Sequence, residues 1–280
     1  MNFFDAELHP VPLRQGDLDD LRFFGVAGAL APADDAVTPA TRETLRRAWD
    51  ALAPGATQRL RRAGIAGFAA VGIHPRCIPW RGLEALLAEL PDFLGRRHVL
   101  AMGAIGLEEG GVREEAVFVR QLELARELRL RVLVYTPWRR KERITRRVLT
   151  LLREHEIEPR LALVTRADAR TVRMIRACGY AAGLSLSAGA GDAIDDAVQL
   201  VRSLGPGGLV LGSGAGDGAG DLLSLPRAAG RMAKAGLSQA VIRRVCCTNA
   251  LQFLGLDESI VKSGRSEAGS GAAARDGGTT

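Results

Sequence analysis

The chain has 280 residues, of which 47% are hydrophobic and 25% are charged, so it can bury a sizeable core and is no disordered chain. Its formal charge is +6 at pH 7, and much of the excess lies on arginines between Arg126 and Arg176. These arginines fall on the polar faces of amphipathic helical segments, where a solvated charged surface is the ordinary arrangement. Nucleic acid is therefore not an expected partner.

The N-terminal segment carries Asp5 and Glu7 before any apolar run long enough for a signal peptide. No stretch reaches the roughly 18 to 20 apolar residues of a membrane span. The four cysteines form no C-x-x-C pair, which is typical of reduced thiols. We therefore expect a cytoplasmic protein without a membrane span.

Short apolar runs alternate with longer segments of helical periodicity along almost the whole chain. The predicted strands are residues 2–7, 22–30, 65–73, 98–103, 131–136, 160–165, 181–186 and 208–211. The predicted helices are residues 39–63, 82–93, 113–129, 142–156, 168–178, 192–204, 223–235 and 238–254.

This alternation predicts an α/β protein with a single (β/α)8 TIM barrel, which typically needs about 250 residues. An open doubly wound sheet would use the same alternation and is the alternative. The barrel is expected over residues 1–257. Residues 258–280 are expected to form a flexible tail, because the sequence from Ser263 onward is rich in Gly, Ser and Ala and has little apolar surface to bury.

Two segments at the ends of the third and fourth predicted strands carry a family resemblance. Residues 69–75 (AAVGIHP) and 101–108 (AMGAIGLE) resemble the "vGiHP" and "iGEiGLD" signatures of the TatD family of metal-dependent hydrolases. Residues 118–125 resemble the family's "F..QL.LA" helix, and segments around 135–141, 171–185, 221–226 and 249–250 resemble a TatD-related branch. The resemblance covers nearly everything before the tail and implies a barrel of the amidohydrolase-like superfamily.

TatD-like enzymes use one or two divalent cations, held by histidines and carboxylates, to polarise a phosphoester and activate water. The family's first-strand His-x-His corresponds here to Glu7-Leu8-His9. The strand-eight aspartate corresponds to Gly216, and Asp217 is adjacent. The resemblance therefore implies a remnant metal site of at most Glu7, His9 and Asp217.

Three further ligand positions have changed. The bridging glutamate corresponds to Ala104, which has no donor atom. The strand-five histidine corresponds to Tyr135, a poor ligand, and the strand-six histidine to Arg166, whose guanidinium has no lone pair. No metal cofactor is therefore expected, and Zn, Mn or Mg would bind only if the remnant site survives.

The retained polar residues predict an anion site. His74 occupies the family's phosphate-binding position, although packing at a strand end would also explain it. Arg166 either points inward, forming an anion site with His74, Tyr135 and perhaps Arg139 or Lys141, or is a surface arginine at the start of a helix. The glycine-rich run at residues 212–220 either cradles a phosphate or is a loop without a ligand.

The leading functional hypothesis is a TatD-like pseudoenzyme, non-hydrolytic or atypical, that binds an anionic small molecule or a partner protein. One alternative is an active phosphoesterase or deoxyribonuclease with a reduced mononuclear site. Another is a scaffold or accessory protein in a biosynthetic pathway. The sequence identifies no catalytic residue.

Overall fold

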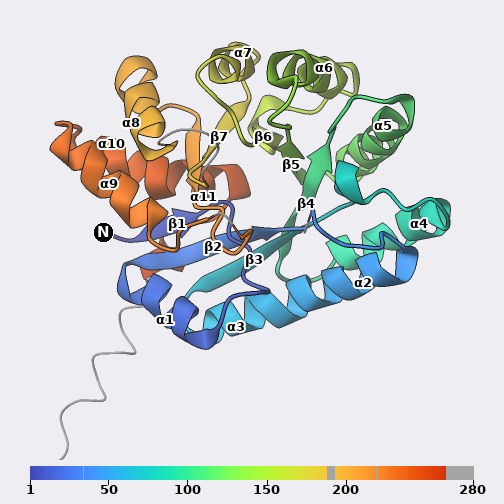
Figure 1. Cartoon of the computed structure of the whole chain (residues 1–280), viewed down its shortest axis with the longest axis horizontal. Helices are drawn as coiled ribbons and strands as arrows, with labels where there is room; N and C mark the ends of the chain where they lie inside the picture. Colours follow the sequence, from blue (N-terminus) through green and yellow to red (C-terminus); the bar gives the residue numbers. More distant parts are fainter. Residues whose placement is uncertain (34, 188–192, 219, 263–280) are drawn as a thin grey trace, which may run out of the picture.

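The computed structural model describes residues 1–33, 35–187, 193–218 and 220–262. Eight parallel strands form one sheet in which each strand pairs with the next along the chain (Figure 1). They are β1 (Phe3–Asp5), β2 (Val26–Pro32), β3 (Ala66–Val71), β4 (Val99–Gly106), β5 (Arg131–Tyr135), β6 (Ala162–Val164), β7 (Ala181–Ser185) and β8 (Leu209–Gly212). The N–H of Ala6, just after β1, donates to the carbonyl of Leu211 in β8 at 3.3 Å. The sheet is therefore a nearly closed barrel, and the predicted TIM barrel is confirmed over the open sheet.

Helices surround this barrel (Figure 1). The α-helices are α1 (Gln15–Phe23), α2 (Arg42–Asp50), α3 (Thr57–Arg62), α4 (Leu83–Leu94), α5 (Val112–Glu127), α6 (Lys141–Glu154), α7 (Thr171–Ala177), α8 (Ala193–Leu204), α9 (Ser224–Lys234), α10 (Gln239–Arg243), α11 (Asn249–Leu254) and α12 (Ser259–Lys262). Two π-helical turns, η1 (Ala51–Ala56) and η4 (Arg244–Thr248), and two 3-10 turns, η2 (Pro75–Cys77) and η3 (Pro159–Leu161), complete the set. All eight predicted helical segments are present.

Helix α1 was not predicted, and the second strand begins later than the predicted residue 22. The helix buries only Leu18 and Leu21, and three aspartates occupy its nine residues. Two apolar residues are too few to give a clear helical period. The side chain of Asp17 supports the start of the helix by accepting the backbone N–H of Arg14 at 2.7 Å.

The single helix predicted over residues 39–63 is divided into α2, η1 and α3. Pro54 lies inside η1 and has no N–H to donate to the preceding turn. The π-helical turn accommodates this proline, while Leu52, Ala53 and Ala56 remain buried.

The barrel interior is packed and closed by the C-terminal helices. One buried cluster contains Phe4, Leu133 and Leu163 from the strands together with Cys247 and Leu251 from η4 and α11. Because this packing fills the interior, any site must lie at the strand ends. Among the residues that the structure describes, no helix is long and apolar enough to cross a membrane.

Helix α12 lies in the segment predicted as a tail. Val261 is 4% exposed and belongs to the interior cluster, and its carbonyl accepts the side-chain N–H of Asn2 at 2.5 Å. The predicted boundary at residue 257 therefore falls before the last helix that packs on the barrel. Residues 263–280 lie outside the described residues.

Candidate functional site

The residues singled out from the sequence all lie at or just beyond the carboxyl ends of strands. This is the end of a TIM barrel at which active sites are built. Glu7 and His9 follow β1, His74 follows β3, Tyr135 ends β5, Arg166 follows β6 and Asp217 follows β8.

Arg166 points into the mouth of the barrel. It is 8% exposed, so its interpretation as a surface arginine at a helix start is wrong. Its Nε lies 3.6 Å from Oε1 of Glu7, its Nη2 lies 3.7 Å from Oδ2 of Asp35, and its guanidinium carbon stands 4.8 Å from the centre of the Tyr135 ring. Its backbone is left-handed, with φ of 58°, which turns the chain sharply at the end of β6. The guanidinium thus lies between two carboxylates that come from distant parts of the sequence.

The charge of Arg166 is stabilised by these neighbours. Burial lowers the pKa of the guanidinium, but the negative charges of Glu7, Asp35 and Asp217 more than offset this effect and raise it. Arg166 is therefore a permanent cation inside a cluster of carboxylates.

Tyr135 donates its hydroxyl to Oε2 of Glu108 at 2.5 Å. Burial and this hydrogen bond raise the pKa of the phenol well above its ordinary value. The side chain is thus a neutral hydrogen-bond donor at any physiological pH. Glu108, at the end of the "iGEiGLD"-like segment, is a site residue that the sequence argument did not single out.

His74 is buried and neutral. Its Nδ1 accepts the backbone N–H of Arg76 at 3.2 Å, which leaves the proton on Nε2, and its ring stands edge-on to that of Tyr135 with centroids 4.3 Å apart. Burial lowers the pKa of His74 to about 3, and the charges of Arg166 and Arg76 also lower it, against the raising effect of Asp35. His74 therefore offers a neutral N–H donor and no positive charge.

The loop after β8 packs closely on the end of β1. A Cβ on Gly216 would lie 2.0 Å from the carbonyl oxygen of His9, and φ of Gly216 is 92°. Close approach and backbone conformation both explain the glycine here. Asp217 follows it and accepts the N–H of Gly220 at 2.9 Å. The Nε2 of His9 is buried and has no hydrogen-bond partner among the described residues.

A cavity of about 610 Å³ opens at this mouth. Its walls carry both signs of charge, with Arg76, Arg139 and Arg166 facing Asp35, Glu108, Glu109 and Asp217. Tyr135, Trp138 and Ser187 also line it. Asp35 was not singled out from the sequence, and its place just beyond β2 is the signal that could have identified it.

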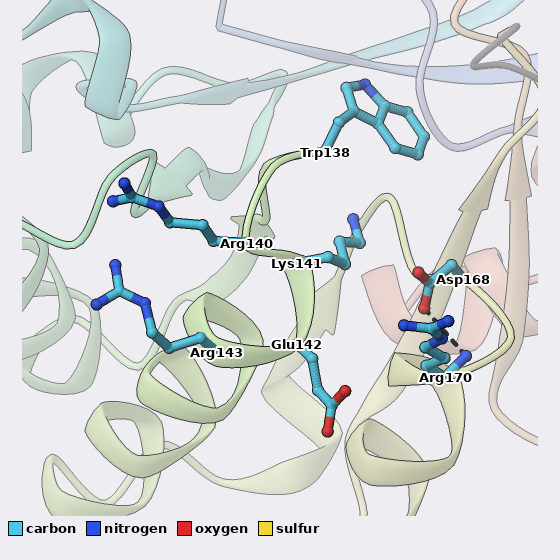
Figure 2. Close-up of a pocket in the computed structure, with 7 residues that line it drawn as sticks. All are labelled: Trp138, Arg140, Lys141, Glu142, Arg143, Asp168 and Arg170. Atoms are coloured by element: carbon cyan, nitrogen blue, oxygen red, sulfur yellow. Dashed lines mark hydrogen bonds between the residues drawn. The ribbon is translucent and has the colours of Figure 1, made fainter.

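Lys141 lines a neighbouring cavity of about 840 Å³ rather than that of Arg166 (Figure 2). Arg139, the other residue considered as a partner of Arg166 in the predicted anion site, lines the same cavity as Arg166. Trp138 lines both cavities. It carries Lys141 Nζ at 4.8 Å and the Arg166 guanidinium carbon at 5.8 Å from its ring centre.

The metal-ligand positions can now be compared with the geometry. Ala104, where the resemblance implies a bridging glutamate, lies buried in β4 and has only a methyl side chain. Within residues 1–33, 35–187, 193–218 and 220–262, no group of three or more His, Cys, Asp or Glu side chains is placed to hold a metal ion.

Known proteins resemble the chain over its whole barrel, although no family model matches it. An uncharacterised metal-dependent hydrolase of Methanocaldococcus jannaschii is 28% identical over 171 residues, which are 61% of this chain and 68% of that protein. The crystal structure of a TatD-like protein of Archaeoglobus fulgidus is 27% identical, covers 91% of this chain and 100% of its own, and superposes with a TM-score of 0.77.

A TatD homologue of Escherichia coli has the same fold at 18% identity, with a TM-score of 0.69 over 91% of this chain and 98% of its own. These similarities agree with the "vGiHP"-like and "iGEiGLD"-like segments, which lie at the ends of β3 and β4. The chain therefore resembles TatD-like proteins in sequence and shares their barrel fold.

Proposed function

We propose that this TatD-like protein is non-hydrolytic and binds an anionic small molecule at the mouth of its barrel. The observation that carries the proposal is the position of the Arg166 guanidinium, 3.6 Å from Glu7 and 3.7 Å from Asp35. A fixed cation would take the place of the divalent ion that the similarity to a metal-dependent hydrolase implies.

The residues at the mouth do not fit a divalent metal. Glu7, the carboxylate that the first strand offers, faces Arg166, and a guanidinium has no lone pair to donate. An ion placed beside Glu7 would be repelled by this permanent charge. Ala104 supplies no bridging oxygen, and Tyr135 keeps its proton.

The hydrogen-bonding state of Arg166 supports an anionic ligand. At 3.6 and 3.7 Å its contacts with Glu7 and Asp35 are ion pairs but too long for hydrogen bonds. Its Nε is buried and has no hydrogen-bond partner in the described part of the chain. Buried donors are normally satisfied, and a guanidinium suits the two oxygens of a carboxylate or phosphate. A bound oxyanion would complete this arrangement.

Other groups at the mouth would orient the ligand. Arg76 and Arg139 add positive charge to the cavity wall. The carboxylates of Glu109 and Asp217 on the same wall would repel a ligand of high negative charge. We therefore expect a small ligand with one carboxylate or phosphate group.

A second candidate is the reduced hydrolase with a mononuclear site on Glu7, His9 and Asp217. The unpartnered Nε2 of His9 favours it, because a neutral imidazole nitrogen is a good ligand for zinc or manganese. A third candidate, a scaffold or accessory protein that binds a partner protein, would use the barrel exterior and leave the mouth empty of ligand.

Thermal unfolding and metal titration separate these candidates. We expect carboxylates or phosphate esters to raise the Tm of the wild type but not of Arg166→Ala, because a ligand stabilises the state that it binds. Arg146→Ala is the matched control, since Arg146 is two-thirds exposed and, among the described residues, its ion pair is with Glu142. Micromolar binding of Zn²⁺ or Mn²⁺ with phosphodiester cleavage lost in His9→Ala would establish the hydrolase instead. No Tm shift with any anion or metal would favour the scaffold.

A further inference from the structure

Lys141 projects its amine into the cavity of about 840 Å³ beside the barrel mouth. Figure 2 shows Nζ pointing into the space between Trp138 and Asp168, while the side chains of Arg140 and Arg143 extend away from it. The lysine begins α6, directly after Arg140, whose left-handed φ of 49° turns the chain out of β5.

The contacts of Nζ are a hydroxyl and an aromatic ring, and Asp168 lines the same cavity. Nζ donates to Oγ1 of Thr136 at 3.1 Å and stands 4.8 Å from the centre of the Trp138 ring. Oγ1 of Thr136 is itself held in place, because it donates to the carbonyl of Thr165 at 2.7 Å. None of the ion pairs between described residues includes Lys141. The amine is therefore fixed in position without a carboxylate partner.

This environment favours the neutral amine. Burial lowers the pKa of Lys141 to about 8; the charge of Arg166 lowers it too, while those of Asp168 and Glu7 oppose the shift. Relative to an ordinary lysine, the free amine is enriched on the order of a hundredfold near neutral pH. A neutral, positioned amine in a cavity is the requirement for nucleophilic attack by lysine.

The cavity also has a recognition group. Arg140 and Arg143 are engaged with Glu109, at 3.1 Å each, and Glu142 is paired with Arg146 at 2.5 Å. The guanidinium of Arg170 lines the same cavity and makes no ion pair with another described residue. It is thus available to an anionic group on a ligand.

We propose that Lys141 is a nucleophile that forms an imine with a small aldehyde or ketone carrying a phosphate or carboxylate, which Arg170 binds. This site is separate from the anion site at Arg166 and does not depend on it. In the reaction, Nζ forms a bond to the carbonyl carbon and the C=O double bond becomes a single bond. The nitrogen loses one proton and the oxygen gains one, which makes the oxygen a hydroxyl. The hydroxyl then leaves as water with the second nitrogen proton, which gives the imine. No oxidant or reductant is required.

Trapping of the imine tests this proposal on the full chain. The protein is incubated near neutral pH with pyridoxal 5′-phosphate and cyanoborohydride, which reduces an imine to a stable amine, and the modified lysines are identified by peptide mass spectrometry. The chain has only three lysines, so Lys234 and Lys262, both exposed, are internal controls. We expect Lys141 to be modified at least about tenfold faster than either, because its free-amine fraction is larger.

Two variants and a second probe complete the experiment. Pyridoxal, which lacks the phosphate, should modify Lys141 more slowly in the wild type, and Arg170→Ala should remove that preference. Lys141→Arg should lose the rapid reaction while keeping the wild-type Tm, which shows that the fold is intact. Equal rates at the three lysines, or a fast reaction that persists in Lys141→Arg, would overturn the proposal. The assigned ligand class would be overturned if the reaction rate at Lys141 were the same with pyridoxal as with pyridoxal 5′-phosphate and unchanged in Arg170→Ala.

Discussion

The carboxylate of Glu7, from the end of β1, lies 3.6 Å from the Nε of Arg166, from the end of β6, and each side chain is about nine-tenths buried. These residues occupy two positions at which the TatD resemblance implies metal-ligating histidines. A buried guanidinium and carboxylate thus stand where the resemblance implies two neutral imidazoles. The positive charge of Arg166 at the barrel mouth is thus balanced by a carboxylate from the same chain.

Removal of Arg166 should destabilise the protein. Arg166→Ala leaves Glu7 as a buried carboxylate without its cation, whereas Asp35 keeps Arg76 at 3.2 Å, and we expect the free energy of unfolding to fall by about 3 kcal/mol. The double variant Glu7→Gln/Arg166→Met should recover most of this loss, because it removes the uncompensated charges. Urea denaturation measures both. An Arg166→Ala variant as stable as Arg146→Ala, on the exposed face of α6, would show that the pair is not formed.

His74 should make stability depend on pH. Because burial lowers its folded-state pKa to about 3, the folded state binds no proton at this histidine between about 6.5 and 3, whereas the unfolded state does. Its contribution to stability therefore falls on acidification through this window, at up to about 1.4 kcal/mol per pH unit.

Unfolding free energies measured across this window for the wild type and His74→Gln test the sign. The difference between the two proteins should shift in favour of the variant as the pH falls. A difference that stays constant with pH would contradict the buried, neutral histidine.

The two tyrosines of the chain provide a matched test of the mouth. The Tyr135 hydroxyl donates to the carboxylate of Glu108 at 2.5 Å, whereas that of Tyr180 donates to the neutral carbonyl of Ile157 at 3.1 Å. Tyr135→Phe should cost about 1–2 kcal/mol of stability and Tyr180→Phe less, because hydrogen bonds to charged acceptors are stronger. A double-mutant cycle of Tyr135→Phe with Glu108→Gln should show coupling. Additive effects would mean that the hydrogen bond is absent in solution.

Alanine substitutions at two glycines after β8 distinguish the cost of a steric clash from the cost of backbone strain. Gly216 and Gly218 both have φ near 90°, but a Cβ at 216 would lie 2.0 Å from the His9 carbonyl, whereas one at 218 meets nothing within 4 Å. Gly218→Ala should cost about 1 kcal/mol from backbone strain alone. Gly216→Ala should cost more than about 2 kcal/mol, because the β8 loop must also move away from β1. Equal Tm values for the two variants would contradict this packing.

Much of the fold follows from local sequence patterns. All eight strands were predicted. A parallel strand that is buried on both faces is a short, nearly continuous apolar run bounded by turn residues, and such runs are recognisable in the sequence. Helix α1 was missed because only Leu18 and Leu21 are buried in it, which is too weak a period. The residues at the strand ends were also identifiable, since a parallel barrel brings those ends together.

The sequence by itself therefore determined the barrel and several of the residues around its mouth, but not Asp35 and Glu108. Only the tertiary structure decided that Arg166 points inward to Glu7 and Asp35, that Tyr135 pairs with Glu108, and that Lys141 faces a separate cavity. These facts depend on side-chain direction and on contacts across strands that lie far apart in the chain. Local patterns predict which residues are buried. The direction of the Arg166 side chain depends on the backbone turn at this residue, with φ of 58°, and this turn brings its charge close to the carboxylates.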